Sequence, residues 1–119
     1  MTTQEIAARL VELGRQGAFE KAHQELYAQD AVSIEPHGTP EFDKETKGMT
    51  AITEKGQRWN AMVVDTHSLK FSDPVIAANS FACTLEMDLT MKEGGRMQMN
   101  ELCVYTVKDG KITSEQFFM

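Results

Sequence analysis

Two carboxylates lie in the sequence where they could perform acid/base chemistry. Glu35 ends a short apolar stretch and is followed at once by Pro36. Glu101 is the one ionisable acid among the inward-alternating side chains of a long strand pattern. A carboxyl group in an apolar cleft has a raised pKa and can exchange a proton with a carbon next to a carbonyl group. If both acids face one cavity, the pair predicts Glu35 as the base and Glu101 as the acid or oxyanion donor.

Each acid also has a purely structural interpretation. Glu35 could be a solvated strand end, or could form a salt bridge with Lys44 or Lys47. Glu101 could lie at a rim with access to water, or a β-bulge could turn it outward. An unpaired carboxylate in apolar surroundings is costly, so the position of Glu101 needs an explanation in either case.

Other side chains could complete a binding site. His37 follows Glu35 by two residues and shares its side in an extended chain, so it is predicted to assist as an acid/base partner. Trp59, the only tryptophan, is predicted either to form a pocket wall or to pack in the core. Tyr105 could supply a hydroxyl from the sheet. The full set of predicted ligand-binding residues is Trp59, Met87, Met99, Cys103, Tyr105, Gln116 and Phe118.

The last hairpin leaves two alternatives for its inward face. Asp109-Gly110 is a strong signal for a two-residue turn, which pairs Val107 with Ile112. That pairing sends Gln116 and Phe118 to the apolar face, and this is the arrangement expected. A bulge would place the residues before them, Glu115 and Phe117, inside instead.

Composition excludes several classes of function. The net charge of −6 argues against nucleic acid or an anionic membrane as a partner. Three scattered histidines and two cysteines give no metal-ligand spacing and no disulfide framework, and no phosphate-binding loop is present, so no cofactor is expected. A reducing cytoplasm is the expected compartment, since no signal or membrane segment is evident.

The elements that must position these residues change character along the chain. Helices are expected from Thr3, over 18–28 and over 48–62, where apolar residues recur at spacings of three and four. A short strand is expected over 31–35 and a polar surface loop over 37–47. From residue 66 onward the period of the apolar residues is two, which predicts strands over 66–71, 75–91, 96–107 and 111–118. The second of these strands is expected to be interrupted near Asn79. The pattern predicts one α+β domain, 1–119, with a curved antiparallel or mixed sheet wrapped as a cone around three helices and an internal pocket.

The long hairpin has a predicted register. A turn centred near Gly94 pairs Leu89 with Met99 and Cys83 with Tyr105. In this register Cys83 and Cys103 are not directly opposite, so a disulfide is not expected.

Several segments resemble one family. These are Gly17-Ala-Phe-Glu-Lys-Ala22, Tyr27 to Pro36, Lys47-Gly-Met-Thr-Ala-Ile52 and the ending Val104 to Phe118. Together they are similar to the nuclear transport factor 2-like superfamily, which includes ketosteroid isomerase and the SnoaL-like polyketide cyclases. The resemblance covers nearly the whole chain. It implies that Glu35 is at the isomerase's base position and Glu101 at, or within one residue of, its protonated acid, while Leu10 stands where that enzyme has a tyrosine.

The resemblance implies a small-molecule function without naming it. The superfamily hosts isomerases, cyclases, hydratases, epoxide hydrolases and non-catalytic binding modules. The expected function is binding of a small apolar organic ligand, with cofactor-free isomerase or cyclase chemistry on a carbonyl compound; lyase or hydratase chemistry is also open. The alternative is a non-catalytic ligand-binding or dimerisation module. A homodimer through the sheet is expected, because the outer strand face carries Leu102 and Val104.

Overall fold

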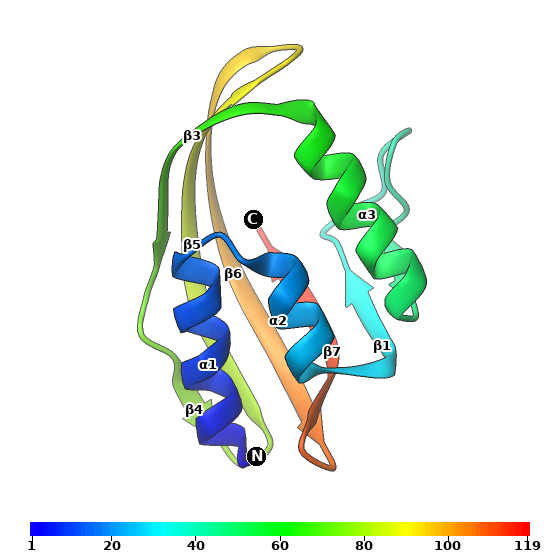
Figure 1. The fold of residues 1–119 in the computed structure, drawn as a ribbon, viewed down its shortest axis with the longest axis vertical. Coiled ribbons are helices and arrows are strands. Elements are labelled where there is room, and N and C mark those ends of the chain that lie inside the picture. The colour runs from blue at the N-terminus through cyan, green and yellow to red at the C-terminus, as the bar shows by residue number, and fades with distance from the viewer.

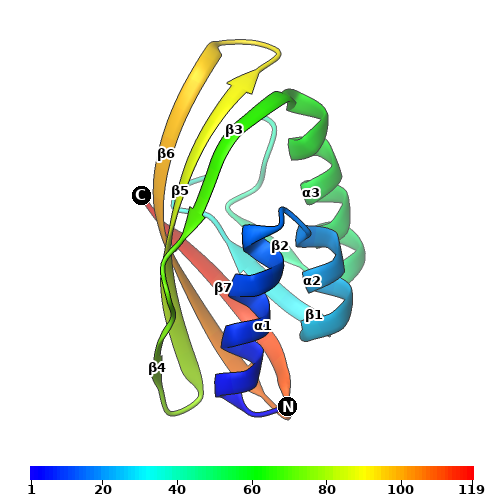
Figure 2. The ribbon, with the colours of Figure 1, turned by 60° about the vertical axis from the view of Figure 1, so that its left-hand side comes forward.

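One curved sheet forms a half-open cone, and three helices pack against its concave face (Figures 1 and 2). The computed structural model describes the whole chain, Met1–Met119. The helices are α1 (Thr3–Arg15), α2 (Phe19–Leu26) and α3 (Met49–Met62). The strands are β1 (Tyr27–Ile34), β2 (Glu45–Lys47), β3 (Val63–Phe71), β4 (Val75–Ala77), β5 (Ser80–Met91), β6 (Gly95–Lys108) and β7 (Lys111–Phe118). The expected α+β cone is confirmed.

The sheet is mixed. Its strand order is β2-β1-β7-β6-β5-β3, and the short β4 pairs with β5. Every pair is antiparallel except β1 and β7, which run parallel. This parallel pairing brings the first strand of the chain beside the last one, so that residues near 35 and 115 lie at the same part of the cone.

Helix α1 is fixed at its start and packed closely near its end. Thr2 and Glu5 form a capping box, in which each side chain accepts a hydrogen bond from the other's backbone N–H. Its inward stripe includes Ile6, Leu10 and Leu13, as the spacing predicts. A Cβ atom added at Gly14 would lie 2.5 Å from the ring of Phe71, so only glycine lets α1 lie this close to β3.

The first strand begins earlier than the sequence pattern indicates. Helix α2 ends at Leu26 rather than at residue 28, and β1 already starts at Tyr27. Pairing with β7 explains the difference, because Tyr27 lies opposite Ile112 and its buried hydroxyl donates to Glu115. Tertiary contacts thus override the local helix preference of this segment.

The register of the long hairpin differs from the expected one by two residues. Strand β5 ends at Met91, which pairs with Gly95, so Cys83 lies directly opposite Cys103. The expectation that the cysteines are not opposite each other was wrong, because Gly94 and Gly95, both with positive φ, allow a tighter turn. A shift of two residues retains the face of every side chain, so the predicted inward set is kept. Both cysteines are buried free thiols.

A bulge in the last hairpin decides which residues face inward. Val107 pairs with Ile112 as predicted, but the register shifts at Thr106, which pairs with Ser114. Tyr105 therefore lies opposite Glu115, and Glu115 is only 4% exposed. The expectation for Gln116 and Phe118 was wrong: the extra residue reverses the alternation, and 47% of Phe118 is exposed.

The outer face of the sheet carries apolar side chains. Leu102 pairs with Phe118, and both are exposed.

Two segments differ in detail from the expected elements. The loop expected over 37–47 contains the short strand β2 near its end, and the strand expected over 75–91 is divided into β4 and β5 by Ala78 and Asn79. None of the helices has the length and apolar character needed to cross a membrane.

Candidate functional site

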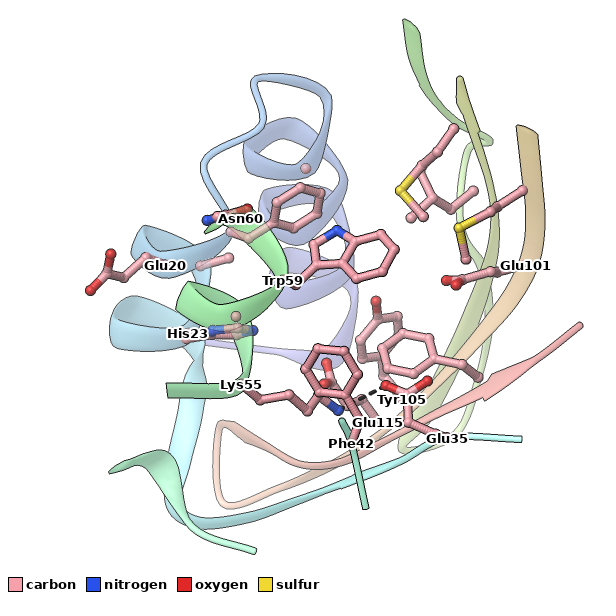
Figure 3. Close-up of a pocket in the computed structure, with 18 of the residues that line it drawn as sticks. Glu20, His23, Glu35, Phe42, Lys55, Trp59, Asn60, Glu101, Tyr105 and Glu115 are labelled. Carbon is pink, nitrogen blue, oxygen red and sulfur yellow. Dashed lines mark hydrogen bonds and ion pairs between the residues drawn. The ribbon is translucent and has the colours of Figure 1, made fainter. Parts of the chain in front are cut away.

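A cavity of about 320 Å³ lies between the helices and the concave face of the sheet. Its walls are mostly apolar, with aromatic side chains from helices, loop and strands (Figure 3). Polar groups enter from β1, β6 and β7 on one side and from α2 and α3 on the other. An apolar cavity with a few converging polar groups is typical of small-molecule sites.

Seven of the predicted site residues line this cavity: Glu35, His37, Trp59, Met87, Met99, Glu101 and Tyr105. Cys103 faces inward but is buried in the core beneath the cavity, at 1% exposure. Gln116 and Phe118 do not line the cavity, because the bulge at Thr106 places Glu115 and Phe117 there instead.

Glu35 forms a close ion pair at the end of β1. Lys55 Nζ lies 2.8 Å from Glu35 Oε1, and the two side chains are 13% and 27% exposed. The alternative of a salt bridge from Glu35 to Lys44 or Lys47 was wrong, because the partner is Lys55. Helix α3 lies over the end of β1 and directs Lys55 into the cavity. The ammonium also donates to Ser33 Oγ at 2.7 Å.

Glu115 anchors a buried chain of hydrogen bonds beside this ion pair. The Tyr27 hydroxyl donates to Glu115 Oε1, and the Ser33 hydroxyl donates to Glu115 Oε2 at 2.6 Å. Ser33 accepts from Lys55 in turn, so the polar groups run from Tyr27 through Glu115 and Ser33 to Glu35. Every member has a partner, as a buried polar network requires.

The sequence contains a signal for two of these missed residues. Ser33 precedes Glu35 by two positions and therefore shares its side of β1. Lys55 follows the buried Ile52 by three positions and precedes Trp59 by four, which places it on the inward stripe of α3. Glu115 could not be found in this way, because its direction depends on the bulge.

Glu101 differs from Glu35 and Glu115 because it has no ion pair or hydrogen bond within the protein. It lies on β6 opposite Leu85 and faces the cavity (Figure 3). Burial, together with the negative charges of Glu35 and Glu115, raises the pKa of Glu101 to about 7, while the positive charge of Lys55 acts against them. Near neutral pH this carboxyl group can therefore either donate or accept a proton.

The hydroxyl of Tyr105 also lacks a partner in the protein. Its ring stacks on Phe81 with the centroids 4.8 Å apart, and the residue is 5% exposed. No buried side-chain polar atom is left unpaired, so this hydroxyl is reached from the cavity that Tyr105 lines. Burial holds the pKa of Tyr105 well above its usual value, so the hydroxyl stays protonated. Leu10 lines the helical side of the same cavity with no polar group.

Two histidines border the cavity. His23 on α2 contacts the edge of the Tyr27 ring, and burial lowers its pKa, which favours the neutral ring. His37 lies in the loop after β1 and lines the cavity together with Glu35. No group of three or more His, Cys, Asp or Glu side chains is arranged to hold a metal ion.

Comparisons with known proteins agree with the fold. The chain matches the family model for the SnoaL-like domain over residues 1–119. A Mesorhizobium loti protein described as a candidate SnoaL-like polyketide cyclase is 34% identical, with a TM-score of 0.92 and 100% of both chains covered. Comparison with curated proteins found no match.

Two more distant structures show the fold alone. TerC, co-crystallised with polyporic acid, is 15% identical with a TM-score of 0.78, covering 99% of this chain and 92% of TerC. A Catenulispora acidiphila protein with a ketosteroid isomerase-like fold, in complex with trimethylamine, is 15% identical with a TM-score of 0.75. The match covers 97% of this chain and 85% of that protein. Other similar structures are described as NTF2-like. The resemblance inferred from the sequence is confirmed, and the chain belongs to the SnoaL-like domain family.

Proposed function

We propose that the cavity binds a small organic carbonyl compound and catalyses cofactor-free proton transfer on it, as in an isomerase or a cyclase. The observation that carries the proposal is Glu101, a cavity-facing carboxyl group without a protein partner whose pKa is raised to about 7. A group with a pKa near the working pH is suited to general acid/base catalysis. Proteins of the same fold crystallised with polyporic acid and trimethylamine support a small organic ligand.

In this proposal the two carboxyl groups have different roles. Glu35, oriented by Lys55, accepts a proton from a carbon next to the carbonyl group. The electron pair of the broken C–H bond forms an enolate, whose oxygen accepts hydrogen bonds from protonated Glu101 and from Tyr105. Isomerisation follows when Glu35 returns the proton to another carbon. Cyclisation follows when the enolate carbon attacks a second carbonyl group, whose oxygen receives its proton from Glu101. His37 assists at the mouth of the cavity, and Trp59, Met87 and Met99 hold the apolar part of the ligand.

Exchange of ligand C–H groups with heavy water tests the catalytic part. A panel of enolisable cyclic ketones and diketones is incubated with the protein in D₂O, and loss of the α-proton signal is followed by NMR. We expect exchange faster than in buffer, reduced at least about 100-fold in Glu35→Gln, the usual contribution of a positioned base. Glu93→Gln, which removes an exposed acid in the β5–β6 turn, is the control. No acceleration for any member of the panel would refute the catalytic part.

A second candidate is a non-catalytic ligand-binding or dimerisation module. Two observations favour it: Leu10 supplies no hydroxyl on the helical wall, and Leu102 and Phe118 expose apolar surface on the outer face of the sheet. We propose a homodimer formed through this face, in the cytoplasm, where Cys83 and Cys103 stay reduced. Sedimentation should give a dimer for the wild type and a monomer for Leu102→Glu. A wild-type monomer at all concentrations would exclude the dimer.

A further inference from the structure

The charged groups around the cavity do not balance. Three carboxyl groups, those of Glu35, Glu101 and Glu115, lie on it against one ammonium group, that of Lys55. Glu20 also borders it, but its side chain is exposed and points away (Figure 3). Lys55 is already engaged, since it contacts Glu35 at 2.8 Å and Ser33 at 2.7 Å. His23 adds no positive charge when neutral, which its burial favours. The interior of the cavity is therefore a region of negative potential.

The side of the cavity near Glu101 contains polar groups without partners. Glu101 makes no ion pair, and the Tyr105 hydroxyl, on a residue 5% exposed, makes no hydrogen bond and is open to the cavity. Figure 3 shows the indole of Trp59 extending from α3 toward Glu101 on β6. An aromatic side chain and a carboxylate at the same site are the groups that proteins use for organic ammonium ions, because the ring and the anion both attract the cation.

We propose that the cavity binds small organic ammonium ions, with Glu101 as the counter-ion, Trp59 as the aromatic wall and Tyr105 as a polar contact. The inference rests on the proposed function only in that the cavity must admit a small organic molecule. It names a second class of ligand for the same site. Neutral carbonyl compounds use the protonated carboxyl group of Glu101 as a donor, whereas ammonium ions use its ionised form as an anion.

The protonation of Glu101 then selects between the two classes of ligand. Burial and the charges of Glu35 and Glu115 favour the protonated form, and a bound cation favours the ionised form. Binding of a cation near neutral pH must therefore release protons from Glu101. The other titratable groups that face this cavity are His23 on α2, Tyr27 at the α2–β1 junction, Glu35 and His37 at the end of β1, Lys55 on α3, Tyr105 on β6 and Glu115 on β7. Glu20 on α2 borders the cavity with its side chain in solvent.

A pair of probes that differ only in charge tests the inference. Choline carries a trimethylammonium group, and 3,3-dimethylbutan-1-ol is its uncharged isostere with a carbon in place of the nitrogen. Trp59 is the only tryptophan and lines the cavity, so its fluorescence reports binding of either probe. At pH 8 we expect choline to bind about tenfold more tightly than the alcohol. At pH 5 the preference should disappear, while the affinity for the alcohol stays the same.

Variants separate the counter-ion from the cavity. In Glu101→Gln the choline preference should be lost at pH 8 with binding of the alcohol retained, and that binding also shows that the cavity is intact. Glu93→Gln removes one exposed charge outside the cavity and should behave as the wild type. The pH dependence of the wild type gives the same answer if Glu101→Gln does not fold.

The possible failures are distinguishable. Equal wild-type affinities for the two probes at pH 8, or a choline preference that persists in Glu101→Gln, would overturn the ammonium site and leave the proposed carbonyl function standing. Absence of binding by both probes would overturn the ammonium site, while the proposed carbonyl function is decided separately by the exchange experiment with ketones. Isothermal titration in buffers of different ionisation heat should show proton release with choline near pH 7 and none with the alcohol.

Discussion

Lys55 and Glu35 form a 2.8 Å ion pair between α3 and the end of β1, at the wall of the cavity. The same ammonium group contacts Ser33, and through Ser33 it connects to the buried carboxylate of Glu115. One lysine therefore stabilises two acids, one of them directly. This relationship orients the proposed base and explains how two carboxylates can lie beside an apolar cavity.

Removal of this lysine should destabilise the fold. Lys55→Met leaves Glu35 without its cation and Ser33 without a donor, both largely shielded from water. We expect a loss of about 2 kcal/mol in the free energy of unfolding, from urea denaturation. Lys47→Met is the matched control, because Lys47 is 76% exposed and lies 3.7 Å from Glu45, and it should change stability by less than about 0.5 kcal/mol. Equal effects would argue against the Lys55 network.

Two buried tyrosines allow a comparison of the same substitution. Tyr27→Phe leaves an oxygen of Glu115 without its donor, and should cost about 1 to 3 kcal/mol in thermal or urea unfolding. Tyr105→Phe removes a hydroxyl without a protein partner at the same exposure of 5%, and should cost less than about 0.5 kcal/mol. A larger loss for Tyr105→Phe than for Tyr27→Phe would contradict the hydrogen-bond assignments.

Two helical glycines should respond in opposite ways to alanine. Gly14→Ala places a Cβ atom 2.5 Å from the Phe71 ring, and should cost about 1 to 3 kcal/mol through overpacking. Gly56→Ala on α3 meets nothing within 4 Å, and should stabilise the protein by about 0.5 to 1 kcal/mol. Differential scanning calorimetry measures both, and destabilisation by Gly56→Ala would indicate that the cavity wall is closer than described.

The stability of the protein should carry a pH signature of Glu101. Because its pKa is about 7 in the folded state and 4.5 in the reference state, the folded protein retains a proton that the unfolded chain releases between these values. Stability from this group is therefore present below about pH 4.5 and is lost as the pH rises to about 7. Glu101→Gln cannot lose that proton, so its stability relative to the wild type should rise by about 2 to 3 kcal/mol across this window. A difference that is constant with pH would contradict the raised pKa.

The sequence indicates the fold and most of the cavity, but not how the polar groups are paired. Periodicity identified the three helices, the long strands and the inward positions of Glu101 and Tyr105, because apolar residues recur with the spacing of the buried face. It did not identify β2 or the start of β1. The direction of Glu115 depends on one extra residue in β7, Thr113, opposite the step from Thr106 to Val107. The pairing of Cys83 with Cys103 depends on the turn at Gly94. Neither the bulge nor the tighter turn can be recognised from the spacing of the apolar residues. Lys55 could be identified as the partner of Glu35 only from the position of α3 over the end of β1. No local pattern in the sequence gives that position.

The pKa of Glu101 is the most direct test of the account. Protein labelled with ¹³C at the side-chain carboxyl of glutamate is titrated by NMR, and the Glu101 signal is assigned from its absence in Glu101→Gln. We predict a midpoint at about pH 7 in the wild type, and a lower midpoint in Glu35→Gln, because the charge of Glu35 raises the pKa of Glu101. A wild-type midpoint near 4.5, the value of an unperturbed glutamate, would contradict the central claim that Glu101 is a partnerless carboxyl group within the cavity.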